Sequence, residues 1–256
     1  VQQAKHHNID IRTRTTITDW EDNTTLKYTS PQGLGVVEAK SVLLATGVRE
    51  RPRSARLTPG GRPQGVFTTG SLQRFVYEKK MPVGKRAVII GAELVSLSAF
   101  TTLKHAGLDV VAMVTELPRH QISFPFSIAK WGLMNVLERT PLYTSTSVQE
   151  IVGRKRVQSI KLSHSETEKV ISIDCDTVVF TGEWIPEYEI ARLGGIKINA
   201  GTLGPQADSR FRTSQEGVFA AGNLLHGAET ADISALEGRS AAGSIQTFLG
   251  SSSWIP

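Results

Sequence analysis

Two stretches of this 256-residue sequence decide the fold: Ala39-Lys-Ser-Val-Leu-Leu-Ala-Thr-Gly-Val-Arg-Glu-Arg-Pro52 and Asp174-Cys-Asp-Thr-Val-Val-Phe-Thr-Gly-Glu-Trp-Ile-Pro186. Each stretch has a polar lead, an apolar run, Thr-Gly and then a proline. A short apolar run that ends in glycine is typical of a buried parallel strand feeding a tight turn. The competing interpretation is chance, because any two buried strands look alike over a few residues.

The segments upstream of the two stretches match as well. Residues 9–20 and 24–29 predict alternating strands before the first stretch, and residues 143–151 and 157–163 predict them before the second. The second pair is broken by the turn Gly153-Arg-Lys-Arg156. Since the whole order of elements recurs, and not only one strand, we interpret the chain as an internal duplication.

A strand, a turn and a helix lie between the two copies. Arg86-Ala-Val-Ile-Ile90 predicts a buried strand, and Gly91-Ala-Glu-Leu-Val-Ser96 predicts a turn that opens a helix reaching about His105. With a further strand at residues 109–115, this order is a βαβ unit of a doubly wound sheet. In the last third, we expect a short buried strand ending near residue 222, a loop at 223–226 and a long helix at 229–249.

The turn after the strand at residues 86–90 is the first candidate site. A glycine turn that opens a helix offers backbone N–H groups and the positive end of the helix dipole to a pyrophosphate. Gly91 keeps the tight turn and Ala92 follows it, but Glu93 stands at the second glycine position of the dinucleotide fingerprint and Ser96 at the third. The Glu93 carboxylate would repel a pyrophosphate unless it turns away or binds a ribose hydroxyl. A βαβ unit that only packs is the alternative.

An acidic residue follows the second strand of this βαβ unit. Glu116 lies where such a residue commonly accepts hydrogen bonds from the adenine ribose, which favours NAD over NADP. Arg119 and His120 come directly after it, and a cation there would suit a 2′-phosphate. A solvated loop of charges is the third interpretation.

Three motifs together resemble a known family. Ala45-Thr46-Gly47, the turn at Gly91 and Gly217-Val-Phe-Ala-Ala-Gly-Asn223 before a helix are similar to the pyridine nucleotide-disulfide oxidoreductase superfamily, which includes thioredoxin reductase. The stretch from Arg49 to Gly70 looks closer to flavoproteins grouped with the sarcosine oxidase alpha and cyanide synthase subunits. The resemblance covers about residues 9–249. It implies an α/β fold with two Rossmann-like dinucleotide-binding domains, in which an NAD-type domain (84–186) is inserted into a partial FAD-type domain (1–83 and 187–256).

The resemblance also implies cofactors and their contacts. FAD is the expected cofactor, and NAD(P) stays open as a second one. The Thr46–Gly47 turn would lie beside the FAD, and the late Gly-Asp motif, here Gly222 and Asn223, would hold its ribityl and pyrophosphate part. Asn223 can still hydrogen-bond a hydroxyl but brings no charge. The remaining implied contacts are the backbone N–H groups of Thr230 and Ala231, facing the flavin ring, and Gly182, the glycine of the second Thr-Gly turn.

The sequence departs from this family in two further ways. The family's first Gly-x-Gly-x-x-Gly, which clamps the ADP half of FAD, lies upstream of the first residue here, so we expect an N-terminally truncated chain. Cys175 is the only cysteine of the chain, which excludes disulfide reduction by a CxxC pair.

The function implied is an FAD-dependent oxidoreductase that transfers electrons between the flavin and NAD(P)H or a small amine or imino acid. The rival is a non-catalytic or degenerate flavoprotein subunit that keeps the fold for assembly, which Glu93 and Asn223 favour. No catalytic residue is identified. His226 is either a proton donor near the isoalloxazine or an exposed loop histidine, and Trp184 either borders a nicotinamide pocket or serves packing.

Composition and charge exclude several function classes. The formal net charge is +5, but Lys and Arg are scattered without a dense basic block, so we expect no nucleic-acid partner. No apolar run approaches the length of a membrane span, and the six histidines are too dispersed for a metal site. We expect a cytoplasmic protein that acts on a small molecule. Other subunits or a second copy of the chain stay open as partners.

Overall fold

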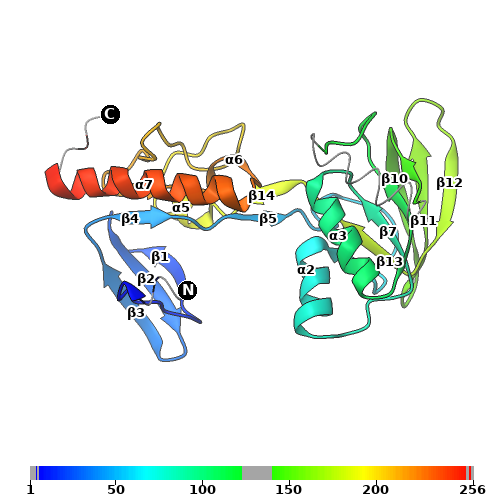
Figure 1. Cartoon of the computed structure of the whole chain (residues 1–256), viewed down its shortest axis with the longest axis horizontal. Coiled ribbons are helices and arrows are strands. Elements are labelled where there is room, and N and C mark those ends of the chain that lie inside the picture. The colour runs from blue at the N-terminus through cyan, green and yellow to red at the C-terminus, as the bar shows by residue number, and fades with distance from the viewer. Residues whose placement is uncertain (1–3, 5, 123–139, 252–253, 255–256) are drawn as a thin grey trace. The chain divides into compact units, whose positions relative to one another are not determined.

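The computed structural model describes residues 4, 6–122, 140–251 and 254 and divides into two compact units. Unit 1 consists of Val1–Arg49 and Trp184–Pro256, and unit 2 is the segment Glu50–Glu183 between them. Figure 1 shows the two units. One unit is therefore inserted into the other. The domain start proposed from the sequence at residue 84 falls inside unit 2, because β6 and α2, before that residue, join the unit 2 sheet and its helical layer.

Unit 2 is built on a five-stranded parallel sheet with the order β6-β13-β7-β8-β9. These strands are β6 (Val66–Thr68), β7 (Arg86–Ile90), β8 (Asp109–Val114), β9 (Leu142–Tyr143) and β13 (Thr177–Phe180). One side carries α2 (Thr69–Gln73), the π-helical turn η1 (Arg74–Glu78) and α3 (Leu94–His105). The other side carries an antiparallel sheet of β10 (Thr146–Gly153), β11 (Val157–His164) and β12 (Val170–Asp174).

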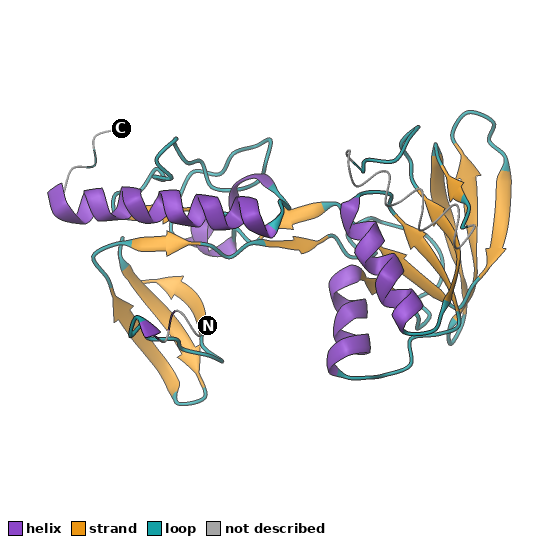
Figure 2. Cartoon of the chain, in the orientation of Figure 1, coloured by secondary structure: helices purple, strands orange, loops and turns teal. Residues whose placement is uncertain are grey.

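Alternation along the central strands gives unit 2 its three layers, which Figure 2 shows. Ala87 and Ile89 of β7 pack with α2 and α3, whereas Val88 between them packs against β10 and β11. Successive side chains of a strand point to opposite faces, so a strand covered on both sides must be apolar throughout. The apolar run of β13 therefore has its cause in this double burial.

Unit 1 repeats part of this plan. An antiparallel sheet of β1 (Thr16–Trp20), β2 (Thr25–Ser30) and β3 (Gly33–Glu38) precedes β4 (Val42–Leu44), which pairs in parallel with β15 (Val218–Ala220). The helices are α5 (Glu189–Leu193), α6 (Asn223–His226) and α7 (Ala231–Ser251). Trp20 packs in the core of this unit, and its indole N–H donates to the carbonyl of Ile190 at 2.7 Å.

The duplication inferred from the sequence is present in the structure. In each copy a three-stranded antiparallel sheet precedes a buried parallel strand, β4 or β13, and each strand leads into a Thr-Gly turn. Gly47 and Gly182 have φ of +74° and +67°, a conformation that favours glycine. The strands that follow, β5 (Val48–Glu50) and β14 (Trp184–Pro186), pair with each other.

Some local predictions were wrong. Residues 9–15 form no strand, because the chain there is exposed and turns at Arg14, whose φ is +55°. Residues 223–226 form one turn of helix, α6, instead of a loop. The strands β3 and β12 were not foreseen, and along the predicted helix at 229–249 only Ala241 is buried.

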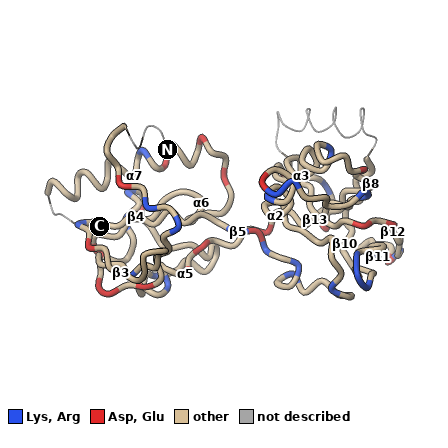
Figure 3. Tube along the Cα trace, turned by 90° about the horizontal axis from the view of Figure 1, so that it is seen from below, with Lys and Arg blue, Asp and Glu red and all other residues tan. Residues whose placement is uncertain are grey.

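Figure 3 shows Lys and Arg interspersed with Asp and Glu in both units. No helix within the described ranges is long and apolar enough to cross a membrane, although α7 has 21 residues.

Cys175 is expected to be chemically inert in the folded protein. Its thiol is 4% exposed between the two sheets of unit 2, and burial, helped by Asp176 and Asp174, raises its pKa from 9.0 to about 12. The thiolate, which is the reacting form, is then far scarcer than in an exposed cysteine. Peptide mass mapping after alkylation at pH 8 should find this residue unmodified in native protein and modified in denaturant. Comparable rates in both states would contradict the burial.

Candidate functional site

The two motifs at opposite ends of unit 1 meet at one sheet edge. Ala220 of β15 pairs with Leu44 of β4, and the Ala221 N–H donates to the Leu44 carbonyl at 3.0 Å. The strands are parallel, so the Thr46–Gly47 turn and the Gly222–Asn223 turn leave the same edge. In doubly wound sheets ligands bind outside the carboxyl ends of such strands.

Open space lies over both glycines of this edge. Gly47 and Gly222 have φ of +74° and +75°, and a Cβ built on either would meet nothing within 4 Å. Two hydrogen bonds to Glu187 fix the Thr46–Gly47 turn. Thr46 Oγ1 donates to the Glu187 carbonyl at 2.7 Å, and the Glu187 N–H donates to the Gly47 carbonyl at 2.9 Å. A ligand can therefore approach the backbone at both turns.

Asn223 acts first within its own loop. Its Oδ1 accepts from the Glu229 N–H at 3.0 Å and from Ser234 Oγ at 3.1 Å, which fixes the start of α7. Thr230 and Ala231, at that start, are exposed. The amide nitrogen of Asn223 makes no hydrogen bond to any described residue and is left as a donor for a ligand.

Glu237 of α7 is a site residue that the sequence analysis missed. One carboxylate oxygen accepts from the Gly222 N–H at 2.9 Å, and the other lies 2.7 Å from His226 Nε2. The His226 side chain is 34% exposed. It is therefore neither an unattached loop histidine nor a buried one, and a carboxylate orients its ring.

These residues fit a flavin dinucleotide. Two glycine turns leave space above the backbone, and α7 is long enough to present a positive dipole end at Thr230 and Ala231. The Asn223 amide offers a hydrogen bond without a charge to repel a phosphate.

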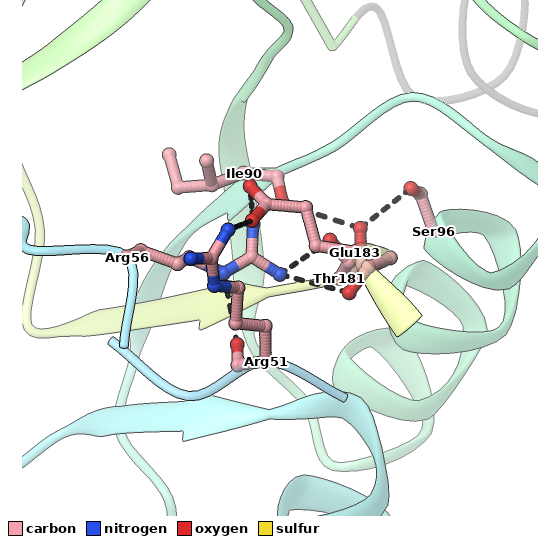
Figure 4. A network of polar contacts seen from close by, with 7 residues as sticks. Arg51, Arg56, Ile90, Ser96, Thr181 and Glu183 are labelled. Carbon is pink, nitrogen blue, oxygen red and sulfur yellow. Dashed lines mark hydrogen bonds and ion pairs between the residues drawn. The ribbon is translucent and has the colours of Figure 1, made fainter. Parts of the chain in front are cut away.

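The second candidate site is the turn after β7 in unit 2. The Gly91 N–H donates to the Val114 carbonyl of β8 at 2.7 Å, so the turn and the residues after β8 share an edge. Glu93 is the N-cap of α3, and its N–H donates to Ser96 Oγ at 3.2 Å. Ser96 Oγ is also 2.8 Å from Thr181 Oγ1, the residue after β13, as Figure 4 shows.

Arg56 fixes the adjoining turn and was also missed by the sequence analysis. The Arg56 side chain is 8% exposed. Its guanidinium donates to the carbonyls of Thr181 and Gly182 at 3.0 and 2.9 Å and to the Glu183 carboxylate at 2.7 Å (Figure 4). A fourth bond reaches the Arg51 carbonyl at 2.9 Å. Burial lowers the pKa of Arg56, which the charge of Glu183 and then that of Glu93 oppose.

The other predicted residues of unit 2 lie at the same edge. Gly182 follows β13, and Glu116 follows β8 and is exposed. The loop after Glu116 returns to the turn, since the Gln121 N–H donates to the Ala92 carbonyl at 2.9 Å. In the described part of the chain, no group of three His, Cys, Asp or Glu side chains could hold a metal ion.

The unit 2 turn does not fit the pyrophosphate of a dinucleotide. A Cβ built on Gly91 would lie 2.7 Å from Glu93 Oε2, and one on Gly182 would lie 3.0 Å from Glu93 Oε1. The space beside both glycines thus holds a carboxylate, in contrast to the open space at Gly47 and Gly222. At Gly222 the nearby carboxylate, Glu237, is bonded to the backbone N–H and does not occupy the space that a Cβ would enter.

Comparison with known proteins gives concordant matches. Residues 1–238 match the family model of pyridine nucleotide-disulphide oxidoreductases. An opine oxidase subunit from Agrobacterium tumefaciens (strain Ach5) is 27% identical over 89% of this chain and 49% of its own length. Dihydrolipoyl dehydrogenase of Manduca sexta is 24% identical over 77% of this chain and 39% of its own length.

A solved structure matches the fold. The thioredoxin reductase of T. acidophilum superposes with a TM-score of 0.78 at 22% identity, over 97% of this chain and 79% of its own. This likeness confirms the expected α/β fold with two dinucleotide-binding domains. The chain spans about half the length, or less, of the curated relatives it matches.

Proposed function

Because the chain belongs to the pyridine nucleotide-disulphide oxidoreductase family, we propose that it functions in an FAD-dependent oxidoreductase. Its flavin would exchange two electrons with NAD(P)H or with a small amine or imino acid. The observation that carries this proposal is the shared edge of β4 and β15, where two glycine turns leave open space side by side. Because Cys175 is the only cysteine, this chain supplies no CxxC disulfide to the reaction.

Named groups of unit 1 would hold the flavin. The Gly47 and Gly222 turns would let its phosphate and ribityl part approach the backbone, and the Asn223 amide would donate to it. The N–H groups at Thr230 and Ala231 would face the ring, where the α7 dipole stabilises negative charge. Bound FAD supplies the capacity to take up a hydride equivalent from a substrate.

The amine or imino acid alternative is supported by the similarity to the opine oxidase protein of Agrobacterium tumefaciens. That relative is named as one subunit of its enzyme, which supports assembly of this chain with further chains. Within unit 1, the Glu237 carboxylate fixes the His226 ring through Nε2, which leaves Nδ1 available to hold or pass a proton. This pair is our candidate for proton handling.

The flavin site can be tested with two glycine variants of the full-length protein. We expect Gly222→Val to lower the affinity for FAD at least about tenfold, a loss of about 1.4 kcal/mol, because the new side chain fills the ligand space. Gly195→Val is the matched control, since Gly195 also lies in unit 1 with φ of +72° and open space around it. The measurement is titration of the apoprotein with FAD, followed by visible absorbance and flavin fluorescence.

Two results would count against the proposal. Wild-type protein that shows no flavin absorbance after reconstitution would leave no oxidoreductase site and would favour a non-catalytic subunit. An equal loss of FAD in Gly195→Val and Gly222→Val would mean that backbone strain, and not a ligand site at Gly222, causes the loss.

A further inference from the structure

We infer that the dinucleotide turn of unit 2 is closed by its own residues and does not accept the pyrophosphate of NAD(P)H. Glu93 is the residue that sets this specificity. The proposed function leaves two electron donors open, NAD(P)H and a small amine or imino acid. If that function holds, the closed turn assigns the donor to the amine or imino acid class. The closure itself concerns unit 2 alone and stands on three contacts.

The first contact is the carboxylate at the helix terminus. Glu93 is the N-cap of α3, a helix of 12 residues, so its negative charge lies at the positive end of the helix dipole. This is the position an anion takes at a glycine turn. The carboxylate lies beside both Gly91 and Gly182, and its Oε1 is buried without a hydrogen-bond partner among the described residues. A pyrophosphate would meet a fixed negative charge there.

The second contact removes room between α3 and β13. Ser96, which stands at the third glycine position of the fingerprint, is fully buried and lies 2.8 Å from Thr181 Oγ1. Thr181 Oγ1 also donates to the Ile90 carbonyl at 3.2 Å, and a Cβ built on Gly91 would lie 1.9 Å from this oxygen. The N-terminus of α3 is therefore held against the sheet by side-chain hydrogen bonds, which leave no room for a phosphate between the turn and Thr181.

The third contact covers the turn. The loop after β8 would run beside the ribose of a bound dinucleotide, yet here its Gln121 N–H donates to the Ala92 carbonyl. Ala92 is fully buried, and Ile122, the next residue of the loop, is 5% exposed. The loop is thus bonded to the turn, and Ala92 is packed inside the unit.

Charge balance explains why a carboxylate is tolerated at this turn. The Arg56 guanidinium is close enough to Glu93 for the carboxylate to raise its pKa, and Arg56 is tied to the neighbouring Gly182 carbonyl. Together with the positive end of the helix dipole, Arg56 offsets the negative charge of Glu93. Glu93 therefore takes the place of the ligand's phosphate in the electrostatics of the turn.

The test is direct binding of ADP-ribose to the full-length protein, measured by calorimetry in the presence of excess FAD so that any flavin site is saturated. We expect no binding to the wild type at millimolar ADP-ribose. Glu93→Gly should bind at least tenfold more tightly than the wild type, and Glu93→Gln, which removes only the charge, should lie between them. Glu168→Gly is the matched control, because Glu168 is an exposed turn residue of unit 2 with φ of +53°. This variant should bind ADP-ribose like the wild type.

The outcomes separate the possible roles of Glu93. Micromolar binding by the wild type that Glu93→Gly weakens would overturn the inference, because the carboxylate would then accept a ribose hydroxyl. No gain in either Glu93 variant, with thermal unfolding showing that both are folded, would overturn the assignment of this specificity to Glu93. FAD content, measured on the same preparations, reports on the proposed flavin site independently, so that a failure there is not confused with a failure here.

Discussion

Replacing Gly91 with alanine is expected to destabilise unit 2 by at least about 3 kcal/mol, because the new methyl group would clash with neighbouring atoms. Gly91 has φ of +137°, where an L-residue is strained, and the added Cβ would lie 1.9 Å from Thr181 Oγ1. That oxygen is bonded to Ser96 and to the Ile90 carbonyl, so it cannot yield cheaply. Urea unfolding followed by circular dichroism measures the change.

A second glycine separates backbone strain from the clash. Gly107 has φ of +78° at the end of α3, but a Cβ there meets nothing within 4 Å, so Gly107→Ala should cost only about 1 kcal/mol. Adding Thr181→Ala to Gly91→Ala should restore part of the loss, since it removes the clashing oxygen. Equal stability of Gly91→Ala and Gly107→Ala would refute the tight contact between the turn and β13.

Truncating Arg56 to alanine is expected to cost about 2–4 kcal/mol. Three backbone carbonyls and the Glu183 carboxylate lose their donor, and Phe180 loses a guanidinium whose carbon lies 5.2 Å from its ring centre. Arg56→Lys should recover less than half of this, because one ammonium cannot replace a planar fork with several donors. The midpoint of thermal unfolding follows the effect.

The matched control for Arg56 is an exposed arginine of the same unit. Arg74 pairs with Glu78 one helical turn away, with side-chain exposures of 68% and 62%. Such surface pairs are worth little, so Arg74→Ala should change stability by less than about 0.5 kcal/mol. A similar small effect for Arg56→Ala would show that the turn after β13 does not depend on the guanidinium.

The repeated apolar stretches made the architecture predictable, because their cause is local. A strand buried on both faces has to be apolar throughout, and β13 is such a strand, whereas β4 buries Val42 and Leu44 and exposes Leu43. The strands β3 and β12 escaped prediction for the opposite reason. They lie at the edges of their sheets and have no fully buried position. β3 contains two glycines and exposes Leu34 and Val36, and β12 has only five residues, so neither gives a strong apolar pattern. The start of unit 2 was hidden because β6 has only three residues and is defined by its pairing with β13.

The sequence suggested candidate site residues only where they match a motif or depart from it. Glu93 and Asn223 are visible in the sequence as departures from a motif, but their contacts with Gly182 and Ser234 are not. Arg56 and Glu237 are linked to the site by partners 125 and 15 residues away in the chain, respectively. The spacing of residues in the sequence does not predict such contacts, because they depend on how the helices and strands pack.

The strand pair β5–β14 bears on how this architecture arose. Where unit 2 begins and ends, the Arg51 N–H donates to the Glu183 carbonyl at 3.0 Å, and the Arg51 guanidinium also reaches the Glu183 carboxylate. A module whose entry and exit are neighbours can be spliced into a host loop, or lost from it, without pulling host strands apart. The gene could thus exchange the inserted module while its surroundings kept their own shape, leaving each copy free to diverge in what it binds.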